Sequence, residues 1–188
     1  MSSTQSLAPR DGVIERLADI VGADHCLTSE KDRRFFSTDL SYIPDEVAEV
    51  VVQPDNAEQL AACVRCATDA GMAVVARGGG MSYTRGYQPE RADSMLIDLR
   101  RMNRILDINT EDMYVAVETG CTWMQLYEAL SERGVRTPYF GPLSGMYATV
   151  GGALSQNSLF LGSGVYNTAA ESVIGLKVAL ADGSLLQT

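Results

Sequence analysis

Between residues 49 and 109, short apolar runs alternate with a longer stripe of apolar residues at helical spacing. The stripe starts after Asn56, which can cap a helix, and stops before Gly71, which can end one. The apolar runs predict strands at residues 50–52, 73–76, 95–99 and 104–108. Strand, helix and strand in succession predict a first small α/β unit over residues 49–109.

The same kind of pattern returns over residues 110–188. A β-type run at 114–117 leads to Thr122, which with Gln125 has the spacing of a capping box for a helix that ends at Gly134. Trp123 lies on the apolar face of this helix, which favours a place in the core. Residues 172–180 predict a buried strand, and Asp182-Gly183 predicts a tight turn into a returning strand. Because the chain stops within that hairpin, we expect this second unit, and the protein, to continue further.

The first 48 residues form a lead into these two units. Residues 1–10 carry no structural pattern and predict a disordered start. Apolar residues at helical spacing predict a packing helix at 13–21, which Gly22 ends. The charged segment from Lys31 to Asp45 predicts an irregular approach to the main fold.

Composition narrows the class of protein. The 188 residues are 46% hydrophobic and 21% charged, which is typical of a globular chain, here of the α+β class with α/β subdomains. A net charge of -9 argues against nucleic acid as a partner, since phosphate backbones are bound by clustered basic residues. No apolar run has the length of a membrane span, and Met1 to Arg10 lacks the apolar middle of a signal peptide, so we expect a cytoplasmic location.

The residue types that bind metals do not gather in this sequence. Cys63 and Cys66 have redox or zinc spacing, but they fall within a predicted helix and no second pair completes four ligands. We expect free thiols and no metal site. His25, the single histidine, is expected to be a solvated or capping residue.

The most informative stretch follows the predicted strand at 73–76. Arg77 precedes three glycines, Gly78, Gly79 and Gly80, and then come Met81 and Ser82. Glycine takes positive φ without steric cost, so successive backbone N–H groups can turn inward and form a cradle for an anion such as phosphate. A P-loop or a Rossmann fingerprint would open a helix here, and this segment has no helix start. A flexible turn between two strands is the alternative that the triple glycine alone leaves open.

A second segment, from Gly141 to Gly164, is rich in glycine and hydroxyl groups and poor in charge. Long segments without secondary structure tend to be functional, so this one can press its backbone against a planar, extended ligand. A mobile surface loop is the alternative. The scarcity of charge between Arg136 and Glu171 favours burial under something.

With both segments in hand, the sequence resembles the FAD-binding, PCMH-type domain of the flavoenzyme family that includes vanillyl-alcohol oxidase, glycolate oxidase subunits and D-lactate dehydrogenases. Four motifs stand in the family's order over residues 49–188. They are Arg77-Gly-Gly-Gly-Met-Ser82, Ile97-Asp-Leu-Arg-Arg-Met-Asn103, Thr149-Val-Gly-Gly152, and Val173-Ile-Gly-Leu-Lys-Val178 followed by Ala181-Asp-Gly183.

The resemblance implies an extended FAD held between two α/β subdomains, 49–109 and 110–188, with the substrate domain beyond this chain. Arg77 and the residues from Gly78 to Ser82 would bind the pyrophosphate. The ribityl chain and flavin would lie along a second set, which comprises Pro142, Leu143, Thr149, Gly151, Gly152, Ser155, Asn157 and Gly162. Val173 or Ile174 would lie near the adenine.

Three positions depart from the family's pattern. Met81 stands where some relatives attach flavin through a histidine, and no cysteine lies between Cys121 and Thr188, where others use one. The resemblance therefore implies non-covalent FAD. Asn167 replaces a common glycine, which puts the local backbone there in question.

The resemblance also implies the reaction. A substrate C–H next to a hydroxyl would give hydride to flavin N5, and a 2-hydroxy acid is the favoured small-molecule substrate. The catalytic base is expected outside this chain, so no catalytic residue is named. A non-catalytic FAD-binding or electron-transfer module completed by another subunit is the alternative. For the assembly, a homo-oligomer and a complex with a partner subunit are both left open. A phosphate binder without redox function is a third possibility, which leaves the second segment unexplained.

Overall fold

The computed structural model describes residues 12–139 and 141–188. Its helices are α1 (Val13–Val21), α2 (Glu30–Ser37), α3 (Ala57–Asp69), α4 (Trp123–Ser131), α5 (Val150–Ser155) and α6 (Ser163–Tyr166), with short 3-10 turns at Ala23–His25, Leu99–Arg101 and Ala169–Ser172. Its strands are β1 (Cys26–Leu27), β2 (Val50–Val52), β3 (Ala73–Arg77), β4 (Ser94–Asp98), β5 (Ile105–Asn109), β6 (Tyr114–Val117), β7 (Lys177–Ala179) and β8 (Leu185–Gln187). The predicted disordered start at 1–10 lies outside the described residues.

A four-stranded sheet organises the first half of the chain, in the order β1-β2-β4-β3. Strands β2, β4 and β3 are parallel, and β1 pairs with β2 in the antiparallel sense. The register places Val51 opposite Leu96 and Arg77 opposite Asp98. The carboxyl ends of three parallel strands therefore meet at one edge of the sheet, and the glycine segment starts at this edge.

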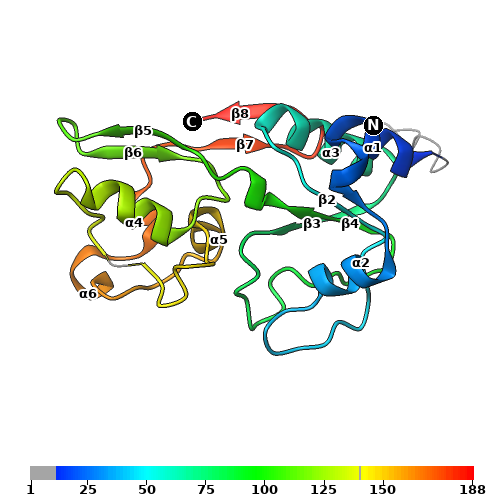
Figure 1. The fold of residues 1–188 in the computed structure, drawn as a ribbon, viewed down its shortest axis with the longest axis horizontal. Coiled ribbons are helices and arrows are strands. Elements are labelled where there is room, and N and C mark those ends of the chain that lie inside the picture. The colour runs from blue at the N-terminus through cyan, green and yellow to red at the C-terminus, as the bar shows by residue number, and fades with distance from the viewer. Residues whose placement is uncertain (1–11, 140) are drawn as a thin grey trace, which may run out of the picture.

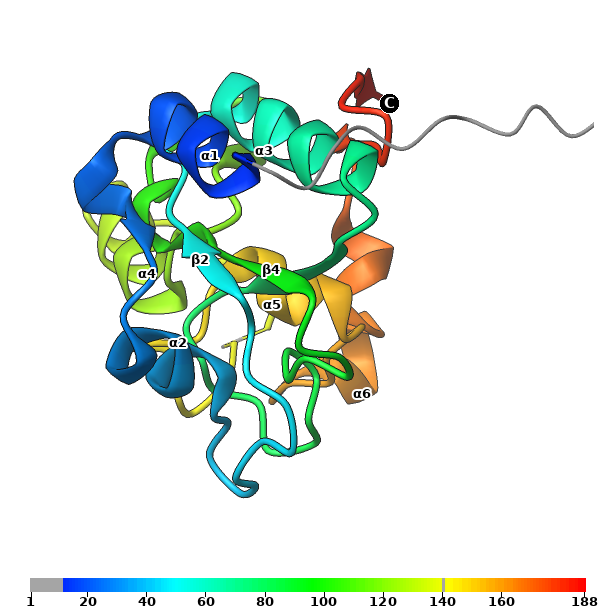
Figure 2. The ribbon, with the colours of Figure 1, turned by 90° about the vertical axis from the view of Figure 1, so that its right-hand side faces the viewer.

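Helices cover both faces of this sheet. Figure 2 shows α1 and α3 above β2 and β4, and α2 below them. Val50, Val52 and Met95 pack toward α1 and α3, while Val51 and Leu96 face Phe36 of α2 on the other side. Burial on both faces explains the continuous valine run of β2, because alternation of apolar and polar residues is needed only where one face meets water.

The second half has a core of its own, which Figure 1 shows on the opposite side of the molecule from β2, β3 and β4. β5 and β6 form an antiparallel hairpin, and α4, α5 and α6 lie beside it. The rings of Trp123, Tyr139 and Phe160 pack edge to face or tilted, with centroids 5.0–5.8 Å apart. Trp123 is 6% exposed, which confirms its predicted place in the core. The predicted boundary at 109/110 falls in this hairpin, and the division into two subdomains stays a prediction.

The C-terminal hairpin differs from the prediction. The expected buried strand at 172–180 is shorter, because β7 starts only at Lys177 and its pairing with β8 is exposed to solvent. The hairpin packs beside α3, where the Thr68 hydroxyl donates to the carbonyl of Ala181 at 2.6 Å and Lys177 pairs with Glu58. The apolar residues of this hairpin are therefore exposed and not buried as expected, because a two-stranded ribbon has no further layer to cover its faces.

Two further expectations were wrong. The segment from Lys31 to Asp45 is not irregular throughout, because Ser29 caps α2 by accepting from the N–H of Asp32 at 3.1 Å and Phe36 anchors the helix to the sheet. The second glycine-rich segment also contains helix, since Thr149 caps α5 by accepting from the N–H of Gly152 at 3.2 Å. In both cases the sequence contains the signal for a helix, a capping hydroxyl at Ser29 or Thr149. It was overlooked because the residues around it are charged or glycine-rich.

Leu17 tests the packing of α1 against the sheet. Its side chain is fully buried, so Leu17→Ala is expected to lower the free energy of unfolding by about 3 kcal/mol, the cost of lost burial and a cavity. Leu106→Ala is the matched control, since Leu106 is 62% exposed. Urea unfolding followed by circular dichroism measures both, and an equal loss for the two variants would contradict this packing.

Candidate functional site

The glycine segment leaves β3 as a loop whose backbone donors are free. Within the described residues, the N–H groups from Gly78 to Ser82 make no hydrogen bond, whereas the strand before them pairs with β4 along its whole length. No helix starts in this loop, as the sequence predicted. Unpaired backbone donors carry a large cost when they are buried, and a bound anion would satisfy them. The loop therefore fits an anion cradle.

The three glycines are required for two different physical reasons. Gly80 has φ +74°, a conformation that residues with a side chain rarely adopt. Gly78 and Gly79 are required for close packing, because a Cβ on Gly78 would lie 2.3 Å from Oγ1 of Thr149 and one on Gly79 would lie 1.7 Å from the carbonyl oxygen of Tyr147. The glycine loop and the second segment therefore touch backbone to backbone.

Side chains on both sides of the loop in sequence, and Ser82 within it, hold the loop in this form. The Tyr87 hydroxyl donates to the carbonyl of Gly80 at 2.9 Å. Ser82 Oγ accepts from the N–H groups of Thr84 and Gly86, and it also lies 3.5 Å from Oγ1 of Thr84. Asp39 Oδ2 accepts from the N–H of Arg85 at 2.8 Å. Sequence reasoning missed Asp39 and Tyr87, which carry no motif.

Asp39 has an altered acidity because of these contacts. Burial raises the pKa of its carboxyl, but hydrogen bonds from the N–H groups of Ser41, Tyr42 and Arg85 outweigh burial and lower the pKa below the ordinary 3.8. The carboxylate is thus the preferred form in the folded chain.

The second segment meets the glycine loop at the start of α5. Thr149 is 2% exposed and approaches Gly78, while the N–H of Gly151 donates to the carbonyl of Thr119. Gly151 has the same requirement for close packing, since its Cβ would lie 1.8 Å from Oγ1 of Thr119. Of the predicted residues, Thr149, Gly151 and Gly152 therefore gather by the loop.

The other predicted residues of the second half make their contacts elsewhere. Ser155 Oγ donates to the carbonyl of Gly151 at 2.8 Å, and Asn157 Oδ1 accepts from the N–H of Ala170. Gly162 approaches Tyr139, and Pro142 accepts from the N–H of Gly145. Leu143 is 98% exposed, Ile174 is 83% exposed, and Val173 is partly buried. No contact of these residues with the glycine loop is found in the described part of the chain.

A crevice of about 380 Å³ opens where the two segments meet. Gly79 and Tyr147 line it together with Arg100, Asn103, Gly120, Thr122, Met124, Gln125 and Met146. Arg100 is held there by Asp98, which accepts from its Nε at 2.8 Å and its Nη2 at 2.9 Å. Arg100 and Asn103 belong to the motif from Ile97 to Asn103, so the signal that could have marked them was present in the sequence.

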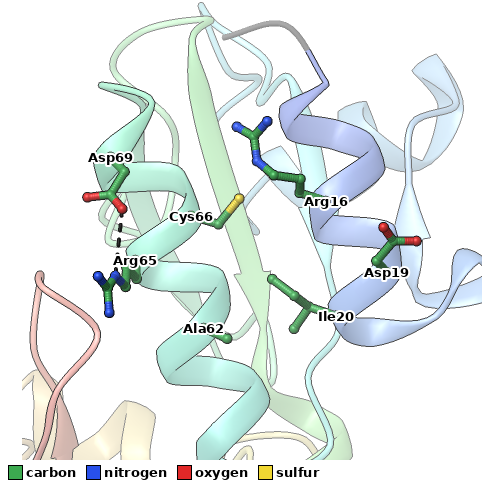
Figure 3. A pocket seen from close by; sticks show the side chains of 7 residues that line it. All are labelled: Arg16, Asp19, Ile20, Ala62, Arg65, Cys66 and Asp69. Carbon is green, nitrogen blue, oxygen red and sulfur yellow. Dashed lines mark ion pairs between the residues drawn. The ribbon is translucent and has the colours of Figure 1, made fainter. Parts of the chain in front are cut away.

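A second hollow, of about 420 Å³, lies between α1 and α3 on the far side of these helices from the sheet. Figure 3 shows Arg16, Ile20 and Cys66 facing it, with Arg65 paired to Asp69 at its margin. None of its lining residues belongs to the two glycine segments.

The cysteines and the helices of the described residues indicate no further functional site. Cys26, Cys63, Cys66 and Cys121 are free thiols, and burial raises the pKa of Cys63 to about 12 and that of Cys121 to about 11. In residues 12–139 and 141–188, no group of three potential metal ligands comes together. Among the helices of these same residues, none has the length and hydropathy needed to cross a bilayer.

Comparison with known families decides the identity of the fold. The family model described as FAD binding domain matches residues 48–188, which is most of the chain. The chain belongs to the FAD binding domain family. The resemblance read from the four motifs is thereby confirmed.

Two relatives illustrate the family's range. The glycolate oxidase subunit GlcD of Bacillus subtilis is 27% identical over 176 residues, which cover 94% of this chain and 37% of GlcD. The mitochondrial D-lactate dehydrogenase [cytochrome] 1 of Saccharomyces cerevisiae is 26% identical over 188 residues, covering 95% of this chain and 31% of that enzyme. The chain thus spans about a third of the length of these relatives.

Several solved structures share the fold. Alkyldihydroxyacetonephosphate synthase matches 96% of this chain and 38% of its own with a TM-score of 0.85 at 20% identity. p-Cresol methylhydroxylase matches 95% and 35% with a TM-score of 0.82 at 19% identity. The glucooligosaccharide oxidase of Acremonium strictum, whose FAD is 6-S-cysteinyl and 8α-N1-histidyl, matches 95% and 36% with a TM-score of 0.77 at 22% identity. The predicted α+β, PCMH-type fold is confirmed.

Gly79→Ala tests the backbone contact between the two segments. Its Cβ would overlap the carbonyl oxygen of Tyr147, so the segments must move apart, and overpacking that costs 1–3 kcal/mol is expected to weaken FAD binding about tenfold or more. Fluorescence titration with FAD measures the change. Gly164→Ala is the control, because its Cβ would meet nothing within 4 Å. Wild-type affinity in Gly79→Ala would show that the contact is not needed.

Asp39 gives a pH-dependent prediction. Because its folded pKa lies below 3.8, its charge stabilises the folded chain above about pH 4, and this contribution is lost as pH falls through the folded pKa. The difference in unfolding free energy between wild type and Asp39→Asn is therefore expected to be constant from pH 6 to 8 and to shrink below pH 4. Denaturant unfolding at several pH values measures it, and a difference independent of pH would count against the carboxylate.

Proposed function

We propose that this chain binds FAD non-covalently and forms the cofactor domain of an oxidoreductase that oxidises a small hydroxyl-bearing molecule, preferably a 2-hydroxy acid. The observation that carries the proposal is the row of five unpaired backbone N–H groups from Gly78 to Ser82, closed against the second segment at Tyr147. A diphosphate is the anion of FAD that this row fits. Family membership supports FAD as its source.

Within this proposal, the chain's own residues bind and orient. The amides of the glycine loop and the hydroxyl of Ser82 would hold the pyrophosphate, and Thr149, Gly151 and Gly152 would border the cofactor on the other side. FAD, when bound, supplies a hydride acceptor. The glycine at position 79 lets the two segments close on the ligand and exclude water.

Met81 and Cys121 support non-covalent attachment of FAD. Met81 cannot form a histidyl link, and Cys121, the cysteine nearest in sequence to the second segment, is fully buried with a raised pKa. A thiolate is the reactive form of cysteine, so this thiol is poorly suited to attack a flavin.

The substrate class is supported by names alone. Glycolate and D-lactate, which appear in the names of two relatives, are both 2-hydroxy acids. Further, we propose the division into subdomains 49–109 and 110–188, with substrate residues and the catalytic base beyond this chain. The word subunit in the name of GlcD favours the second candidate, an FAD-binding module completed by a partner.

The test starts with the absorbance spectrum of the purified full chain before and after acid precipitation. Flavin bands released into the supernatant are expected, since non-covalent FAD leaves the unfolded protein. Colour retained in the pellet would contradict non-covalent binding, and a colourless protein that takes up no added FAD would overturn the proposal. In a longer form of the protein that includes the proposed substrate domain, anaerobic addition of D-lactate or glycolate is then expected to bleach the flavin, with a sugar aldose as the comparison substrate. Bleaching by the sugar only would overturn the substrate class.

A further inference from the structure

Arg77 is a buried cation without a carboxylate of its own. Its side chain is 6% exposed and lies at the end of β3, directly before the glycine loop. Among the ion pairs of the described residues, none includes Arg77. Within residues 12–139 and 141–188, its Nε has no hydrogen-bond partner, and its Nη1 donates to the carbonyl of Gly78 at 3.4 Å. A buried donor left unsatisfied is costly, so this arrangement calls for an explanation.

Aromatic rings take the place of a carboxylate around this guanidinium. Its Cζ lies 5.0 Å from the ring centroid of Phe36, 5.1 Å from that of Tyr87 and 5.8 Å from that of Phe35. A cation over the face of an aromatic ring is attracted by its quadrupole, more strongly where water is excluded. The rings thus hold the charge in place without neutralising it.

The carboxylate opposite Arg77 in the sheet already has other partners. Asp98 is opposite Arg77 in the sheet register, but it accepts two hydrogen bonds from the guanidinium of Arg100, one from the Arg100 backbone N–H and one from Gln53. Arg100 also stacks on Phe36, with its Cζ 5.3 Å from the centroid. Two guanidinium groups therefore share one carboxylate at this edge of the sheet, and one positive charge remains uncompensated.

This charge lies directly behind the glycine loop. A Cβ on Gly80 would be 2.1 Å from Nη2 of Arg77 and 2.7 Å from its Cζ, so the guanidinium fills the space that a side chain would take. Tyr87 holds the same residue from the other direction through its bond to the Gly80 carbonyl. The guanidinium, its ring neighbours and the loop form one packed unit.

We propose that Arg77 is a positioning residue of the cradle: caged by Phe36 and Tyr87, it stands behind Gly80 and supplies, through the loop, the positive charge that a diphosphate requires. The inference rests on the proposed function and deepens it, because it assigns Arg77 an indirect part in place of the direct contact expected from sequence. Its ligand is the diphosphate of FAD, so ADP shares the requirement and riboflavin does not.

The experiment compares the full wild-type chain with Arg77→Met and Arg77→Lys by titration with FAD, ADP and riboflavin. Methionine keeps much of the volume without the charge, and Arg77→Met is expected to weaken FAD and ADP binding about tenfold while leaving riboflavin affinity unchanged. Arg77→Lys is expected to restore most of the loss. Arg104→Met is the matched control, because Arg104 is exposed and paired with Glu118 away from the loop.

The outcomes separate this inference from the proposed function. A wild-type chain that binds neither FAD nor ADP overturns the proposed function. Wild-type binding that Arg77→Met leaves unchanged overturns the inference alone, as does an Arg77→Lys variant no better than Arg77→Met, since shape rather than charge would then matter. If thermal melting shows that Arg77→Met does not fold, Arg77→Gln decides: it removes the charge but keeps a polar side chain, and is expected to weaken ADP binding about tenfold. Unchanged ADP affinity in that variant overturns the inference.

Discussion

The close approach of two backbones, at Gly79 and Tyr147, is the constraint on which the site depends. A single Cβ at residue 79 would come within 1.7 Å of the Tyr147 carbonyl oxygen, so no other residue type permits the contact without movement of one segment. The two segments come from opposite halves of the chain, some seventy residues apart in sequence. The contact therefore does more than fill space, because it fixes how the halves enclose a ligand.

The sheet delivers the loop to this contact. Three parallel strands end together, and the helices α1, α3 and α2 bury β2 and β4 on both faces, with β3 paired to β4 at the margin of the sheet. The loop starts from an ordered strand, so less conformational entropy is left to lose when its own backbone is fixed. Asp39 accepts a hydrogen bond from the N–H of Arg85, and Tyr87 donates one to the carbonyl of Gly80. These bonds stabilise one conformation of the glycine loop.

Local signals in the sequence were sufficient for the elements and for the first segment. The capping residues Asn56 and Thr122 and the stop at Gly71 marked α3 and α4 because they act within one turn of helix. The second segment was harder, because its glycines disguised the cap that Thr149 gives α5. Asn167, which stands where relatives often have glycine, has φ +63° and ψ −159°, a region that is occupied almost only by glycine, so the backbone there is strained.

What the sequence could not show depends on contacts between distant residues. Arg77 was expected to touch the ligand, but its burial against Phe36 and Tyr87 depends on how α2 and the loop fold back on β3, which no motif encodes. Likewise, the exposure of Leu143 and Ile174 follows from tertiary packing, not from their hydropathy. Motifs identify segments, whereas the partner of each side chain is set by the whole fold.

The net charge of the chain opposes the binding of an anion at the glycine loop. The chain carries a net charge of -9, so its overall field repels an anion such as a diphosphate. Long-range attraction cannot bring or hold such a ligand, and binding must depend on groups within a few ångströms of it, where a buried charge is screened little. Aligned amides and one guanidinium without a carboxylate provide this at the end of β3. In an acidic protein, short-range geometry has to supply what net charge opposes, which is why the close packing of glycines matters here.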